Sequence, residues 1–215
     1  MIMSTYISKI WLVNEEPEGW LSIAKEWQRF DSKPVTLVVG QEGKTTELVA
    51  REIQLCNSTF FETALKKEWL EGQTRKIHLT EDDPGIINRY LNFLYTGRIA
   101  GAPGLDALAR LYVYGQKTLD LCLKNAVLKY ILEELYDIFE RDLFMEGACI
   151  VYEGTSSSSL GRKLLVDIFL AVGESDWLKD EGVPEEFRQD ALLRFMDFKK
   201  RPDIDDDLSI SNYVE

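Results

Sequence analysis

The chain has 215 residues, of which 45% are hydrophobic, and its 37 acidic and 25 basic side chains give a formal net charge of −12. A chain of this length buries roughly 70% of the surface that its unfolded form exposes, so neither a metal nor a disulfide is needed for folding. The negative charge repels nucleic-acid phosphates and no basic stripe offsets it, so we expect no binding to DNA or RNA.

The cysteines and the first residues bear on the cellular compartment. Cys56, Cys122 and Cys149 lie in apolar stretches and form no C-x-x-C pair, which predicts buried free thiols in a reducing compartment. The apolar run at residues 10–13 is too short for a signal sequence or a membrane span. We therefore expect a soluble intracellular protein, cytoplasmic or nuclear, with no membrane partner.

An amphipathic helix is predicted at residues 17–30, within an N-terminal segment of residues 1–30. Its apolar side chains recur at helical spacing between charged residues. Trp20, Leu21 and Trp27 are candidates for a homodimer or partner interface, because aromatic side chains are favoured interface anchors. The alternative is that this face packs against its own domain.

A β-hairpin is predicted next, from strand-like runs at residues 35–39 and 45–49 around a polar turn. The turn contains Gly43-Lys44-Thr45, the end of a phosphate-binding loop motif. That motif also requires a glycine where this sequence has Val38, and a helix where β-branched residues follow. The hairpin is therefore favoured, and a nucleotide-binding enzyme using this turn is the less favoured alternative.

A helix and a short strand follow the hairpin. Phe61, Leu65 and Trp69 fall at i, i+4 and i+8, which predicts one continuous helix. Thr59 and Glu62 have the spacing of a capping box at its start. Residues 77–79 predict the strand.

The stretch EDDPGIINRYLNFLYTG, residues 81–97, has the clearest helix signals. Asp83 is a good N-cap, Pro84 suits the first helical position and Gly97 supplies a stop. Further helices are expected around residues 108–115, 127–135 and 164–169, with the Ser-rich stretch 155–161 as a loop or a helix cap. A last helix begins at Pro184 and is expected to bury Phe187, Ala191, Leu192, Phe195 and Met196.

No residue pattern points to catalysis, a cofactor or a metal. His78 is the only histidine and lies between Ile77 and Leu79, where an outward-facing strand residue is expected. One histidine and three scattered cysteines do not form a zinc motif. We therefore assign no catalytic, cofactor-binding or metal-binding residue and expect a non-enzymatic protein.

Several motifs occur in a fixed order along residues 31–137. They are VTLVVG (35–40), LVAREIQLCNSTFF (48–61), IHLTEDDP (77–84), YLNFLYTG (90–97) and LARLYVYGQKTLDLCLKNAV (108–127). The third and fourth are similar to L-x-E-D-D-P and F-L-Y-T-G signatures, and the whole order resembles the BTB/POZ domain family. Residues 138–200 resemble the C-terminal helical region of fungal members, and residues 201–215 are an acidic tail.

The resemblance implies an α+β, Skp1-like fold in which helices wrap a small mixed sheet, with additional C-terminal helices. It also implies a protein-interaction module that self-associates, docks a protein partner or acts as a scaffold. The alternative that it implies is a substrate adaptor of a cullin-type ubiquitin ligase.

Two sites of the family are only partly matched. Family homodimers often carry an acid, a histidine and a base in a charged pocket near the interface. Arg51 matches the base, whereas Pro34 and Ala50 stand at the other two positions.

For cullin binding, Tyr95 matches the contact tyrosine of Y-T-G. Asn92 replaces an acidic residue that is frequent at its position, which removes a charge-assisted contact of about 1.5–3 kcal/mol.

Overall fold

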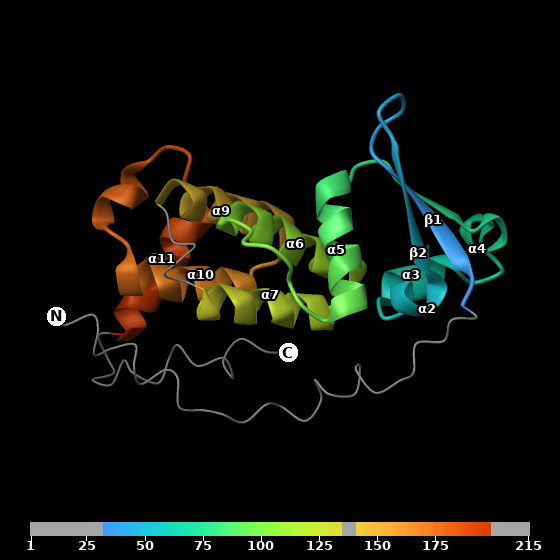
Figure 1. Cartoon of the computed structure of the whole chain (residues 1–215). Helices are drawn as coiled ribbons and strands as arrows, with labels where there is room; N and C mark the ends of the chain where they lie inside the picture. Colours follow the sequence, from blue (N-terminus) through green and yellow to red (C-terminus); the bar gives the residue numbers. More distant parts are fainter. Residues whose placement is uncertain (1–31, 135–140, 199–215) are drawn as a thin grey trace, which may run out of the picture.

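The computed structural model describes residues 32–134 and 141–198. The predicted N-terminal helix with Trp20, Leu21 and Trp27 lies outside the described residues, as does the acidic tail. Within the described part the fold is mixed α+β: a three-stranded sheet at one end of an elongated molecule, and helices that extend away from it (Figure 1). The predicted α+β class is confirmed at that level.

The sheet is built on the predicted hairpin. Strands β1 (Pro34–Val39) and β2 (Thr46–Arg51) pair antiparallel, and β3 (Lys76–Leu79) pairs parallel with β1, so the order is β2-β1-β3. Gly40 and Gly43 in the turn have φ angles of 101° and 85°, which glycine adopts without strain. The turn leads directly into β2, so the helix N-terminus that a phosphate loop requires does not follow it.

The chain between β2 and β3 differs from the prediction of one continuous helix. It forms three short helices, and Trp69 lies outside them with 54% of its surface exposed. The capping-box prediction is also wrong, because Ser58 is the N-cap and its hydroxyl donates to the Thr118 carbonyl at 2.7 Å. The helices are α2 (Glu52–Leu55), α3 (Thr59–Ala64) and α4 (Leu70–Thr74).

Helix α5 (Pro84–Thr96) stands between the sheet and the other long helices (Figure 1). Its predicted ends are confirmed: Asp83 Oδ1 accepts hydrogen bonds from the Gly85 and Ile86 amides at 2.8 and 3.1 Å, and Gly97 ends the helix with φ 68°. The helix buries one face, and its residues at 88, 92, 95 and 96 stay exposed.

The remaining helices form a bundle in which α6 packs on both α7 and α9. Sequence periodicity did not predict α9, which begins just after the undescribed residues 135–140. The predicted boundary at 137/138 falls in that gap, and the helices on its two sides share one continuous hydrophobic core. The elements are α6 (Leu105–Thr118), α7 (Leu121–Glu133), α9 (Arg141–Gly154), α10 (Leu160–Val172), the 3-10 helix η3 (Ser175–Lys179) and α11 (Glu185–Phe198).

A buried carboxylate joins two of these helices, α5 and α7. Asp120 is 2% exposed; it accepts a hydrogen bond from the Tyr90 hydroxyl on α5 at 3.0 Å and another from the Leu123 amide on α7 at 2.9 Å. Burial raises the pKa of Asp120, and these hydrogen bonds to the carboxylate oppose that shift. The position of α5 relative to α6 and α7 thus depends on a small buried polar cluster.

The last helix differs from its prediction on one face. Phe187 and Ala191 are buried as expected, but Leu192, Phe195 and Met196 are 63%, 45% and 53% exposed. Apolar spacing alone predicts one broad buried stripe, whereas the bundle covers only one side of α11.

The cysteine prediction is also partly wrong. The thiols are free, but Cys122 is exposed and Cys56 and Cys149 are only half-buried. Desolvation raises the pKa of all three thiols, which lowers the fraction of reactive thiolate at neutral pH. Of the helices that are described, none is long and apolar enough to cross a membrane.

Substituting Tyr90→Phe is expected to lower the free energy of unfolding by about 1–3 kcal/mol, because the buried Asp120 carboxylate loses a donor that water cannot replace. Urea unfolding followed by circular dichroism measures this. Tyr130→Phe is the control, since the Tyr130 hydroxyl makes a surface hydrogen bond to the Gly101 carbonyl. Equal effects of the two substitutions would show that the Asp120 cluster is not a special constraint.

Candidate interaction surface

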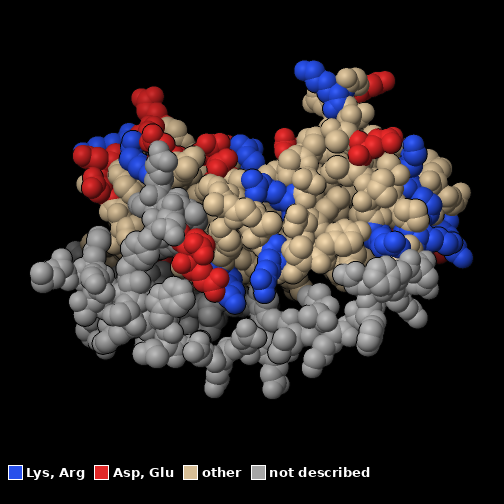
Figure 2. Space-filling view, in the orientation of Figure 1, with Lys and Arg blue, Asp and Glu red and all other residues tan. Residues whose placement is uncertain are grey.

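A groove of about 300 Å³ runs between strand β2 and helix α5. Helix α5 contacts β2, and the groove between them is open to solvent. Every side chain that lines it is uncharged, and in Figure 2 the surface over α5 and the adjoining part of the sheet is largely free of charged atoms. The lining residues are Leu48, Val49, Asn88, Leu91, Asn92, Tyr95 and Thr96.

One wall of the groove is the free edge of the sheet. The Glu52 amide donates to the Lys33 carbonyl at 3.0 Å, so the backbone groups of Glu52 point toward the β1 side of the hairpin. Since hydrogen-bonding directions alternate along an antiparallel strand, Val49 and Arg51 direct their N–H and C=O groups away from β1. Strand β2 is an edge strand, so these groups face the groove side.

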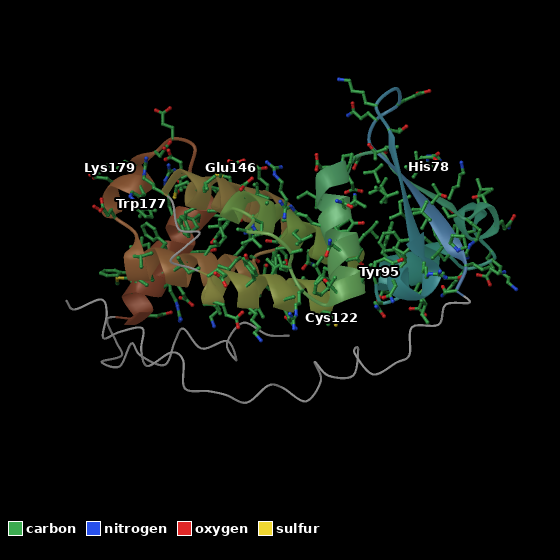
Figure 3. All side chains as sticks on the ribbon, viewed as in Figure 1. His78, Tyr95, Cys122, Glu146, Trp177 and Lys179 are labelled. Carbon is green, nitrogen blue, oxygen red and sulfur yellow. The ribbon has the colours of Figure 1, made fainter. Side chains whose placement is uncertain are left out.

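Tyr95 closes one end of this edge. Its hydroxyl accepts a hydrogen bond from the Arg51 backbone amide at 2.9 Å, and Figure 3 shows Tyr95 between α5 and the sheet. The Val49 side chain, two residues earlier on the same strand face, is 65% exposed. The edge is therefore occupied at Arg51 and open at Val49.

Arg51, Asn92 and Tyr95, which the sequence assigns to two different candidate sites, lie together in the structure. Arg51 was a candidate for a dimer pocket, and Asn92 and Tyr95 for a cullin-binding face. Arg51 and Tyr95 are directly hydrogen-bonded, and Asn92 lies one helical turn before Tyr95 in the same groove. The other three candidates, Trp20, Leu21 and Trp27, lie outside the described residues.

The pairing of β1 with β2 also shows where the residues of the partly matched dimer pocket lie. Pro34 lies directly opposite Arg51 across the hairpin, and the Arg51 guanidinium donates to the Ser32 carbonyl at 3.0 Å. Its charge thus serves a local contact at the start of β1 rather than an acid at position 34.

The groove has the chemistry of a site for an extended peptide. The outward backbone groups of Val49 can pair with another strand, and the exposed amides of Asn88 and Asn92 can each donate and accept hydrogen bonds. Leu48 and Leu91 supply apolar contact area between them. Such a site selects backbone and apolar side chains rather than a charged ligand.

Sequence reasoning missed Leu48, Val49, Asn88, Leu91 and Thr96 as site residues. Each was read only as part of a strand or helix, because the status of β2 as an edge depends on the pairing order of three strands. A signal was present in Asn88 and Asn92, which recur at i and i+4 on α5 opposite its buried stripe.

The described residues outside the groove form no metal-binding cluster. His78 is exposed on the outer face of β3, as predicted (Figure 3). Across residues 32–134 and 141–198, no three His, Cys, Asp or Glu side chains lie close enough together to hold a metal ion.

Removing the Tyr95 hydroxyl with Tyr95→Phe is expected to speed hydrogen exchange at the Arg51 amide, because that amide then faces the groove without an acceptor. Nuclear magnetic resonance can follow this single amide. The Ala50 amide, which points toward β1, is the internal control. Unchanged exchange at Arg51 would mean that Tyr95 does not close the edge in solution.

A scan of the sequence against models of known protein families finds no match, and a search of the curated proteins finds none either.

Proposed function

We propose that this protein is a non-enzymatic protein-interaction module of the BTB/POZ type, which binds an extended segment of a protein partner in the groove between β2 and α5. The observation that carries the proposal is the open strand edge at Val49 beside a neutral groove lined by two exposed amides. Exposed edges of this kind recruit further strands unless charges, proline or a covering element block them. Here Tyr95 blocks one position and leaves the next open.

The fold lends further support to the BTB/POZ assignment. The motifs that resemble the family fall on a hairpin, a parallel third strand and a capped helix in that order. Shared architecture alone does not define a partner, so the proposal rests on the site rather than on the fold. The partner can be a different protein or a segment of a second copy.

A cullin-type scaffold is the second candidate partner, and the position of Tyr95 favours it. Tyr95 is 40% exposed at the end of α5, and Asn92 is exposed beside it. The groove holds no acid at that position, so a basic contact from the scaffold would lack its partner. Binding to a cullin-type scaffold should therefore respond to the charge at position 92.

Val49→Pro is expected to weaken binding of groove ligands about tenfold or more, because proline removes the outward N–H while the hairpin bonds to β1 are made by neighbouring residues. Peptides selected from a random display library on the full chain would serve as ligands, with affinities measured by fluorescence anisotropy. Val49→Thr keeps the N–H and the shape, and should bind normally. Selected peptides that bind both variants equally would exclude strand pairing at this edge.

Asn92→Glu is expected to tighten binding to the N-terminal region of a cullin-type scaffold by about tenfold or more, because it restores the charge-assisted contact. Isothermal titration calorimetry measures the change, and Asn88→Glu, one turn earlier on the same face of α5, is the matched control. If neither the unmodified chain nor Asn92→Glu binds the scaffold, the adaptor function fails while the groove proposal stands.

A further inference from the structure

Two side-chain amides, those of Asn88 and Asn92, lie on the wall of the groove that α5 forms. The residues are one helical turn apart, so their Cβ atoms are about 5–6 Å from each other on the same side of the helix. Both are exposed, and within residues 32–134 and 141–198 neither amide has a hydrogen-bond partner. The groove therefore offers two NH2 donors and two carbonyl acceptors to a molecule that occupies it.

The pairing of β2 determines which side chains of an added strand would reach these amides. Leu48 lies opposite the fully buried Leu37 and packs against the core, so its side chain is on the face of the sheet that α5 adjoins. Val49 points to the other face and is 65% exposed. In a strand that pairs with the backbone of Val49, the side chain of the residue opposite Leu48 therefore enters the groove, and its two neighbours face outward.

The remaining polar side chains of the groove are already hydrogen-bonded. The Thr96 hydroxyl donates to the Asn92 backbone carbonyl at 2.8 Å and accepts from the Arg98 amide at 3.2 Å. The Tyr95 hydroxyl accepts from the Arg51 amide at 2.9 Å. Selection among side chains that enter the groove thus depends on Asn88 and Asn92.

A partner strand that covers the groove removes water from these two amides. An apolar side chain opposite Leu48 would cover them without replacing their hydrogen bonds to water, which is unfavourable. A charged side chain would lose its own water beside lining residues that are all uncharged. A primary amide carries no charge and supplies both a donor and an acceptor, so one such group can bond to both Asn88 and Asn92.

We propose that the groove selects partner strands that carry an Asn or Gln side chain opposite Leu48, held between the amides of Asn88 and Asn92. The inference rests on the proposed function and adds the chemical class of the partner: an extended segment with one amide side chain turned toward α5. The residue opposite Val49 is expected to be β-branched, because Val49 offers an exposed apolar side chain for a cross-strand contact.

Short peptides selected from a random display library on the full chain are the probe. Their sequences should share Asn or Gln at one position, and replacing that residue with Leu or Glu should weaken binding about tenfold or more in fluorescence anisotropy. Selected peptides without a common amide position, or an amide that Leu replaces without loss, would overturn the inference. A library that yields no binding peptide would overturn the proposed function as well.

A double substitution tests whether the peptide amide contacts α5. In Asn88→Leu with Asn92→Leu, the peptide should lose its preference for Gln over Leu, because no amide remains to pair with it. Both positions are exposed, so the core stays unchanged, which circular dichroism checks. Gln189→Leu is the matched control, since Gln189 is an exposed amide on α11 at the far end of the molecule (Figure 1). A tenfold preference that survives the double substitution would overturn the inference.

Val49→Pro separates this inference from the proposed function. It should weaken the Gln and Leu forms of a peptide alike, because both forms pair with the same strand edge. Weaker binding in Val49→Pro without any amide preference would overturn this inference and leave the proposed function standing. An amide preference with no effect of Val49→Pro would overturn strand pairing, and with it the placement of the amide opposite Leu48.

Discussion

The arrangement of the molecule depends on the buried carboxylate of Asp120. An ionised carboxylate in a protein interior is strongly unfavourable unless hydrogen bonds compensate for lost water, and here the Tyr90 hydroxyl and the Leu123 amide do so. Those two donors belong to α5 and α7, so the requirement to satisfy one side chain sets how the two helices meet. The backbone carbonyl of Thr118, two residues before Asp120, accepts a hydrogen bond from the Ser58 hydroxyl. This bond connects the start of α3 to the same junction.

The groove follows from that junction. Helix α5 is held on one side by Tyr90 and buried apolar residues, so its other side, with Asn88, Asn92 and Tyr95, must face the edge of the sheet. The Tyr95 hydroxyl accepts a hydrogen bond from the Arg51 amide at one end, and Val49 stays 65% exposed two residues earlier on the strand. A site for an extended peptide thus arises where a rigid helix meets a strand edge that it only partly covers.

A second buried polar group, the guanidinium of Arg162, constrains the end of the molecule that carries α11. Arg162 is 6% exposed; its guanidinium donates to backbone carbonyls at Tyr152 and Thr155, pairs with Glu186 and lies 4.4 Å from the centre of the Tyr152 ring. Together with the Asp167–Arg194 pair it fixes the orientation of α11 and leaves four large apolar side chains outside, those of Leu192, Leu193, Phe195 and Met196. Helix α11 and the sheet lie at opposite ends of the molecule and share one continuous hydrophobic core.

The sequence by itself determined the local elements whose signals are chemical and short-range. The hairpin, the strand before α5, and α5 with its Asp83 cap and Gly97 stop were predictable because turn glycines, capping carboxylates and alternating apolar residues act within a few positions. Tyr95, Asn92 and Arg51 could be singled out only through resemblance to a family, which did not reveal that they lie together. Tertiary structure alone decided that β2 is an edge, that the chain breaks at Trp69, that Asp120 is buried and that Leu192 and Met196 are not. Helical periodicity shows that a face is apolar, but what covers that face depends on contacts between residues far apart in the sequence.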